Sequence, residues 1–137
     1  MNAGRKKLLI VDDEEPLTEM MRISLEALGN FRVRTENDPL RAVEVARRFQ
    51  PDLIVLDLYM PELDGEGVIA RIRNEPELAK IPVVFFSGYV SPSECTMIGN
   101  CRLLSKMMTF DEVAASLKQA LADADGQSTP LAQPLVA

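Results

Sequence analysis

The chain has 137 residues, of which 47% are apolar and 26% charged, so its length fits one folded domain and its composition excludes a disordered or fibrous protein. Acidic residues outnumber basic ones by 21 to 15, and the net charge of −6 argues against a nucleic-acid partner or an anionic membrane surface. The sequence contains no histidine. This excludes a phosphohistidine carrier, a catalytic group built on histidine, and a histidine-containing metal site.

The N-terminal segment and the two cysteines bear on the compartment of the protein. A run of only four apolar residues precedes the first acidic residues, which is too short for the core of a signal peptide. No apolar run approaches the ~18 residues that cross a bilayer. The count of Cys95 and Cys101 allows a disulfide, but we expect a cytoplasmic protein in which both thiols are reduced.

Short apolar runs predict the strands of a buried sheet. Four of these runs cover residues 8–11, 53–56, 83–86 and 102–104. A fifth run, at residues 31–35, alternates with charged residues and therefore predicts a half-exposed edge strand.

Between these runs, apolar residues spaced three and four apart predict helices. Gly29 stands where the C-cap of the first helix is expected, while Asp38-Pro39 and the capping box at residues 109–112 mark two helix starts. The segment at 91–99 is short and rich in Ser and Thr, and it is also interpreted as a helix. The helices are expected at residues 16–28, 38–49, around 68–72, at 91–99 and from 109 onward.

Strand and helix thus alternate along the chain, which is typical of an α/β protein with a doubly wound parallel sheet and helices on both faces. From about Asp123 the sequence turns to Ala, Gln, Ser and Pro without periodicity. We expect residues 123–137 to form a flexible C-terminal tail.

Polar residues follow the predicted strands where each strand ends. Asp12 and Asp13 follow the first strand, Asp57 the third, Ser87 the fourth and Lys106 the fifth. Each of these residues alone has an ordinary reading as a cap, a turn residue or a surface amine. Together they fall on the rim where open α/β sheets bind their ligands, and this favours a shared site.

Three carboxylates at one rim repel one another unless a cation neutralises them. A hard divalent ion with oxygen ligands resolves the repulsion, and Mg²⁺ is the simplest candidate. A lysine and a hydroxyl opposite such an ion suggest a phosphoryl group, whose oxygens need positive charge and donors on several sides. In that interpretation Asp57 is a nucleophile that forms an acyl phosphate.

Five short segments in fixed order match a known family. They are LLIVDDE at 8–14, LIVLDL at 53–58, MPELDG at 60–65, VVFFS at 83–87 and the late Lys106. The chain resembles the receiver domain of two-component response regulators over about residues 6–122. The resemblance implies a flavodoxin-like, five-stranded sheet with the strand order 2-1-3-4-5.

The resemblance also implies a role for each matching residue. Asp57 would be the phosphoacceptor. Asp13 and Asp57, with the backbone carbonyl of Tyr59, would hold Mg²⁺, while Asp12 would act mostly through bound water. These positions stand in the sequence where the family carries its metal site.

In the same resemblance, Ser87 would bond a phosphoryl oxygen and Lys106 would pair with the phosphoryl group or with Asp57. The donor would be a sensor histidine kinase or a histidine phosphotransfer protein, and the output would be binding to a downstream target protein. We therefore expect a stand-alone signalling phosphoacceptor that catalyses at most its own phosphorylation and dephosphorylation.

Two positions differ from the family pattern. The family usually has proline after the lysine, often with a cis peptide, whereas Met107 follows Lys106 here. A cis bond between these residues would cost ~3–4 kcal/mol, so we expect a trans bond and a looser resting contact to Asp57. The family also commonly has Phe or Tyr where this chain has Leu103.

Two other functions stay open at this point. A degenerate receiver would bind a partner without phosphorylation. A phosphohydrolase of the haloacid-dehalogenase type also uses an aspartate nucleophile with Mg²⁺, but it needs a second aspartate two residues later, where this chain has Tyr59.

Two surface features are also predicted. Tyr59 and Tyr89 each follow a site residue by two positions, so their rings either overhang the site or lie on the surface away from it. The segment at 91–99, with Met97, is expected to form the output surface together with the fifth strand and the last helix. The first helix, with Met20, is the rival docking surface.

Overall fold

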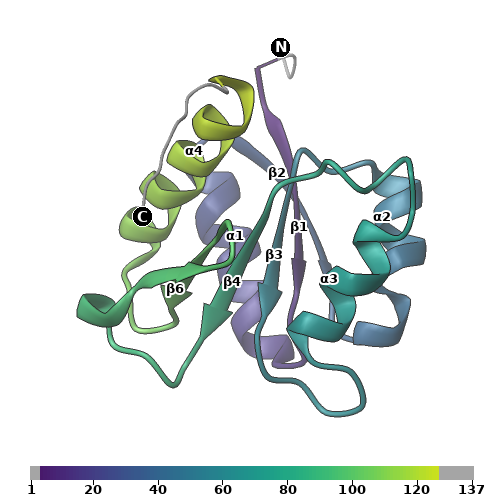
Figure 1. Cartoon of the computed structure of the whole chain (residues 1–137). Helices are drawn as coiled ribbons and strands as arrows, with labels where there is room; N and C mark the ends of the chain where they lie inside the picture. The colour runs from purple at the N-terminus through teal and green to yellow at the C-terminus, as the bar shows by residue number, and fades with distance from the viewer. Residues whose placement is uncertain (1–3, 127–137) are drawn as a thin grey trace.

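The computed structural model describes residues 4–126. Strands and helices alternate through most of this length (Figure 1). The strands are β1 (Lys6–Val11), β2 (Phe31–Glu36), β3 (Leu53–Asp57), β4 (Val83–Ser87), β5 (Thr96–Ile98) and β6 (Cys101–Ser105). The α-helices are α1 (Glu15–Ala27), α2 (Ala42–Phe49), α3 (Gly65–Arg73) and α4 (Phe110–Gly126), and short 3-10 turns cover Pro39–Arg41 and Pro92–Glu94.

The sheet is a doubly wound one, and the predicted α/β fold class is confirmed. Its strand order is β2-β1-β3-β4-β6-β5, and every pairing except β5 with β6 is parallel. Helices α1 and α4 cover one face and α2 and α3 cover the other (Figure 1). Strands β3 and β4 are buried along their whole length because both of their faces are covered. Strand β2 lies at the edge and is half exposed, as predicted.

The helix predicted at residues 91–99 is wrong. Its first part forms the 3-10 turn, in which Ser91 and Glu94 make a reciprocal capping box, and its second part forms β5. Gly99, with φ at +61°, turns the chain so that β5 pairs antiparallel with β6. β-branched Thr96 and Ile98 favour this strand over a helix. The predicted five-stranded parallel sheet therefore gains a sixth, antiparallel strand at its edge.

The predicted helix caps are present. Gly29, with φ at +89°, follows the end of α1. The side chain of Asp38 accepts a hydrogen bond of 3.0 Å from the backbone of Leu40. Thr109 and Glu112 bond each other's backbone N–H groups at 2.8 and 3.1 Å, which is the predicted capping box at the start of α4.

Helix α4 continues to Gly126, past residue 123 where the tail was expected to begin. The Asp123 carboxylate pairs with Arg102 of β6 at 2.6 Å and accepts a bond from Gln119 one turn earlier. These contacts support one further turn. The remainder of the predicted tail, residues 127–137, lies outside the described residues. Between residues 4 and 126 the helices are all too short or too polar to span a bilayer.

Candidate functional site

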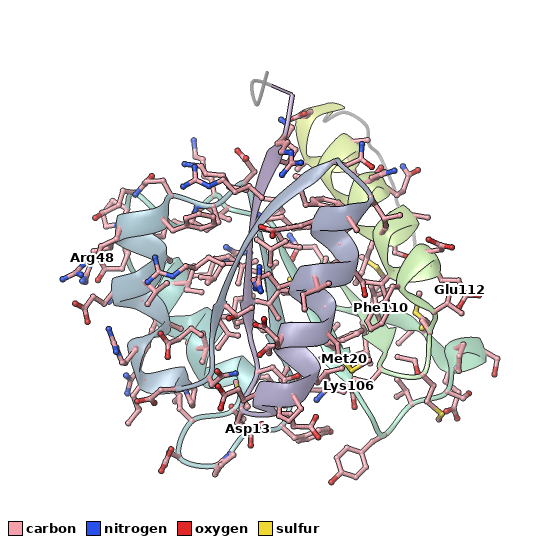
Figure 2. The ribbon with its side chains drawn as sticks, turned by 180° about the vertical axis from the view of Figure 1, so that it is seen from behind. Asp13, Met20, Arg48, Lys106, Phe110 and Glu112 are labelled. Carbon is pink, nitrogen blue, oxygen red and sulfur yellow. The ribbon has the colours of Figure 1, made fainter. Side chains whose placement is uncertain are left out.

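The carboxyl ends of β1, β3, β4 and β6 meet at one edge of the sheet, and the predicted site residues lie there. Figure 2 shows Asp13 and Lys106 at the same end of the molecule, near the start of α1. A pocket of about 380 Å³ opens at this edge. It is lined by Asp13, Glu14, Asp57, Tyr59, Gly88, Tyr89 and Lys106.

The three predicted carboxylates come together. Asp12, Asp13 and Asp57 each place one oxygen within 4.8 Å of the others. Asp12 and Asp57 are buried, with exposed fractions of 1% and 4%, whereas Asp13 is exposed. Oδ2 of Asp12 is buried and lies against the Lys106 ammonium. Three carboxylate oxygens that converge on one point fit a hard divalent cation such as Mg²⁺.

Lys106 places its ammonium among carboxylates at the site. Its Nζ lies 2.8 Å from Oδ2 of Asp12, 2.7 Å from Oε1 of Glu14 and 3.3 Å from Oδ1 of Asp57. Burial alone would lower the pKa of Lys106, but hydrogen bonds to Asp12 and Glu14 and the surrounding negative charge raise it above its usual value. The lysine is therefore positively charged across the physiological range.

The turn after β6 fixes where Lys106 begins. Its backbone N–H donates to the carbonyl of Ser87 at 2.8 Å. No peptide bond between residues 4 and 126 is cis, so the Lys106–Met107 bond is trans, as predicted. The contact to Asp57 is the longest of the three ion pairs, and the expectation that it is looser than in receivers with proline after the lysine stays a prediction.

Burial is the largest influence on the pKa of Asp57, followed by the charge of Asp12. Both raise the pKa of Asp57, and Lys106 only partly opposes them. The pKa of Asp57 therefore reaches about 7. Burial likewise raises the pKa of Asp12. A bound cation would favour the ionised form of both residues.

Ser87 and the two tyrosines complete the pocket. Ser87 is buried, and its Oγ accepts a 3.0 Å hydrogen bond from the backbone of Tyr89. The Tyr59 and Tyr89 rings meet edge to face, with centroids 5.2 Å apart. Both residues line the pocket beside Asp57, and both are exposed, by 57% and 82%, so shielding of the site by their rings stays a prediction.

Several positioning contacts were missed in the sequence. Glu14 directly follows the two predicted acids, Asp12 and Asp13. Its position in this acidic run could have indicated that it also lies at the site. Asn37, at the end of β2, donates to the Asp12 carbonyl at 2.8 Å and to the Thr18 hydroxyl at 3.0 Å. Ser105 is fully buried and links the Lys106 turn to the segment after β4, since its hydroxyl donates to the Val90 carbonyl at 2.7 Å. Neither Asn37 nor Ser105 belongs to a sequence motif that would predict these positioning hydrogen bonds.

Comparison with known proteins agrees with this architecture. The family model of the response regulator receiver domain matches residues 8–118. The chain belongs to this family. The match favours it over the haloacid-dehalogenase alternative, whose second aspartate is replaced by Tyr59.

Individual relatives and structures are similar over nearly the same length. The polar-differentiation response regulator DivK of Brucella anthropi is 32% identical over 122 residues, which cover 87% of this chain and 98% of that protein. The receiver domain of the hybrid histidine kinase CckA has a TM-score of 0.70 at 27% identity, covering 84% of this chain and 98% of that one. A response regulator from Desulfuromonas acetoxidans has a TM-score of 0.73 at 24% identity, with coverage of 85% and 97%, and shares the fold.

Proposed function

We propose that this receiver is a stand-alone response regulator that is phosphorylated on Asp57 with the help of Mg²⁺ and signals by binding a target protein. The observation that carries the proposal is the placement of Asp57. It is a buried carboxylate at the end of β3 that lines an open pocket together with Asp13 and Lys106. The donor is the phosphohistidine of a sensor histidine kinase or of a histidine phosphotransfer protein.

In the reaction, an Asp57 carboxylate oxygen attacks the phosphorus and the N–P bond to the donor imidazole breaks. The imidazole leaves with the electron pair of that bond, and an acyl phosphate forms on Asp57. The donor brings the activated phosphorus, so this chain needs only to position groups and offset charge. Lys106 supplies positive charge 3.3 Å from Asp57. Ser87 accepts from Tyr89, and its hydroxyl hydrogen remains available for a phosphoryl oxygen.

For Mg²⁺, the proposed ligands are Asp13, Asp57 and the carbonyl of Tyr59, with Asp12 acting through water. When bound, the ion supplies the positive charge that lets an anionic donor approach these carboxylates. The mutual distance of the three carboxylates supports this assignment. An exposed Asp13 beside two buried acids also leaves an open route for a hydrated ion.

The proposal that this receiver acts without an attached output domain is supported by a relative. The match covers 98% of the DivK protein of Brucella anthropi, so that relative consists almost wholly of a receiver. We propose the same architecture here, with protein partners and neither nucleic acid nor membrane. A cytoplasmic location is supported by the free thiols of Cys95 and Cys101.

Intact mass after incubation with acetyl phosphate and Mg²⁺ tests the proposal. The wild type is expected to gain one phosphoryl group, whereas Asp57→Asn and a sample without divalent cation are expected to gain none. Asp13→Ala should lose both labelling and its dependence on the metal. A wild type that is never labelled would instead support the degenerate receiver, which binds its partner without phosphorylation.

A further inference from the structure

The Lys106 ammonium has one carboxylate partner outside the proposed metal site. Its contact with Glu14 is the shortest of its three ion pairs, at 2.7 Å, and is a hydrogen bond. Asp12 and Asp57 belong to the group of carboxylates that converge on one point, and Glu14 does not. A metal ion would therefore compete with Lys106 for Asp12 and Asp57 while leaving its bond to Glu14 intact.

The backbone of Glu14 is fixed, although its side chain reaches into solvent. Its N–H donates to Oδ1 of Asp12 at 2.9 Å, and its carbonyl accepts from the backbone of Thr18 at 3.1 Å. The Glu14 side chain is 59% exposed, compared with 1% for Asp12 and 5% for Asp57. The two buried carboxylates need the positive charge of the ammonium, because separation from it would leave them unpaired in a poorly hydrated site. Glu14 can turn into water at little cost.

We infer that Glu14 is a positioning residue that holds the Lys106 ammonium on the β1 side of the site and gives it up to the arriving phosphoryl group. The inference rests on the proposed function, because the phosphoryl group is what would draw the ammonium away. Both the phosphoryl oxygens and Glu14 are anionic and compete for the same three N–H donors. The Glu14 contact therefore slows the step in which Lys106 turns toward Asp57.

Removal of Glu14 does not release Lys106 into solvent. Asp12 and Asp57 still lie 2.8 and 3.3 Å from the ammonium and keep it in the cluster. The ammonium is then free to shift toward Asp57, where the phosphoryl group forms. Since an exposed ion pair contributes little free energy, the expected gain in phosphorylation rate is roughly twofold to fivefold.

Three variants separate this contact from a general effect of charge. Glu14→Gln removes the charge at constant side-chain length. Glu14→Asp keeps the charge but is one methylene shorter, and so it cannot span the 2.7 Å contact from the same backbone position. Glu15→Gln removes a charge from a neighbouring exposed acid in the first turn of α1.

The first measurement is the rate of labelling by acetyl phosphate at saturating Mg²⁺. Both Glu14 variants are expected to be labelled faster than the wild type, and Glu15→Gln at the wild-type rate. If Glu14→Asp behaves as wild type while Glu14→Gln is faster, the charge acts without the contact and the inference is overturned. Unchanged or slower labelling of both Glu14 variants also overturns it.

The second measurement needs neither metal nor donor. Nitrogen-15 NMR follows the exchange of the Lys106 ammonium protons with water, which the surrounding carboxylates slow in the wild type. Exchange is expected to accelerate in both Glu14 variants and to stay unchanged in Glu15→Gln. Equal exchange in the wild type and the Glu14 variants refutes the contact. Failure of the proposed function is distinct, because it appears as a wild type that cannot be labelled while this exchange difference persists.

Discussion

Asp12 and Asp57 differ from the exposed acids of this chain because their carboxylates are buried at the end of the sheet. Burial penalises their charged forms, and their closeness adds mutual repulsion. Lys106 relieves part of this repulsion in the resting protein. At the scale of single residues, the remaining repulsion between the carboxylates thus favours binding of a cation.

The first prediction concerns pH. In the folded protein the pKa of Asp57 is about 7, whereas in the unfolded chain the carboxyl group has its ordinary pKa of 3.8. The folded state therefore binds more protons between these values, and this residue lowers the free energy of unfolding as the pH rises from about 4 to about 7. Above pH 7 the loss is complete, and its size is on the order of a few kcal/mol.

Urea unfolding of the metal-free wild type and of Asp57→Asn checks this prediction. The variant should gain stability relative to the wild type as the pH is raised from 5 to 8, because Asn cannot ionise. Lys106 stays charged over this range, so it does not contribute to the difference. A difference between the two proteins that is constant with pH would show that Asp57 ionises normally in the folded state.

The second prediction concerns the lifetime of the phosphorylated form. Tyr59 and Tyr89 pack edge to face and line the pocket beside Asp57, so we expect their rings to restrict the approach of a water molecule to the phosphorus. Replacing both with Ala should accelerate phosphate release severalfold while leaving the labelling by acetyl phosphate intact. Timed release of phosphate from the purified phosphoprotein measures this. Equal rates in the wild type and the double variant would refute shielding by the rings.

Elements whose signals are local could be predicted from the sequence. The buried runs, the helix caps at Gly29 and Thr109 and the placement of site residues after the strands follow from periodicity and cap chemistry. The hairpin of β5 and β6 could not be predicted in this way, because β5 is three residues long and exists only by pairing with β6. The Glu14–Lys106 contact joins residues 92 positions apart and depends on side-chain packing.

The third prediction distinguishes two docking surfaces. Met97 on β5 is 52% exposed, and Met20 on α1 is 56% exposed at the end of the molecule that also carries Lys106 (Figure 2). Met97→Glu is expected to weaken binding of the phosphorylated protein to its target roughly tenfold, since a charge would enter an apolar contact. Met20→Glu is expected to slow transfer from the kinase or phosphotransfer protein instead.

Labelling by acetyl phosphate serves as the control for both variants, because this donor needs no protein surface. Both should be labelled at the wild-type rate. Calorimetry measures target binding, and radiolabel transfer measures the reaction with the kinase. Unchanged target affinity of Met97→Glu would exclude the hairpin as the output surface, and unchanged transfer to Met20→Glu would exclude α1 as the donor surface.

For the whole molecule, the repulsion at the sheet edge would link the proposed metal binding to the stability of the fold. The carboxylates come from β1 and β3, which the fold brings side by side, so the unfolded chain does not present the same cluster. A ligand that binds only the folded state stabilises it by mass action. The proposed phosphorylation and the stability of the fold would thus depend on the same neutralisation of charge.

The last prediction follows from this linkage. Mg²⁺ at about ten times its dissociation constant should stabilise the wild type by roughly 1.4 kcal/mol, which raises the Tm of a domain of this size by about 3–6 °C. Asp13→Ala should lose the shift while folding normally without metal, because Asp13 is exposed and makes no ion pair among residues 4–126. Thermal unfolding with MgCl₂, against NaCl at equal ionic strength, measures the effect. An equal shift with both salts, or a full shift in Asp13→Ala, would show that screening rather than a bound ion stabilises the protein.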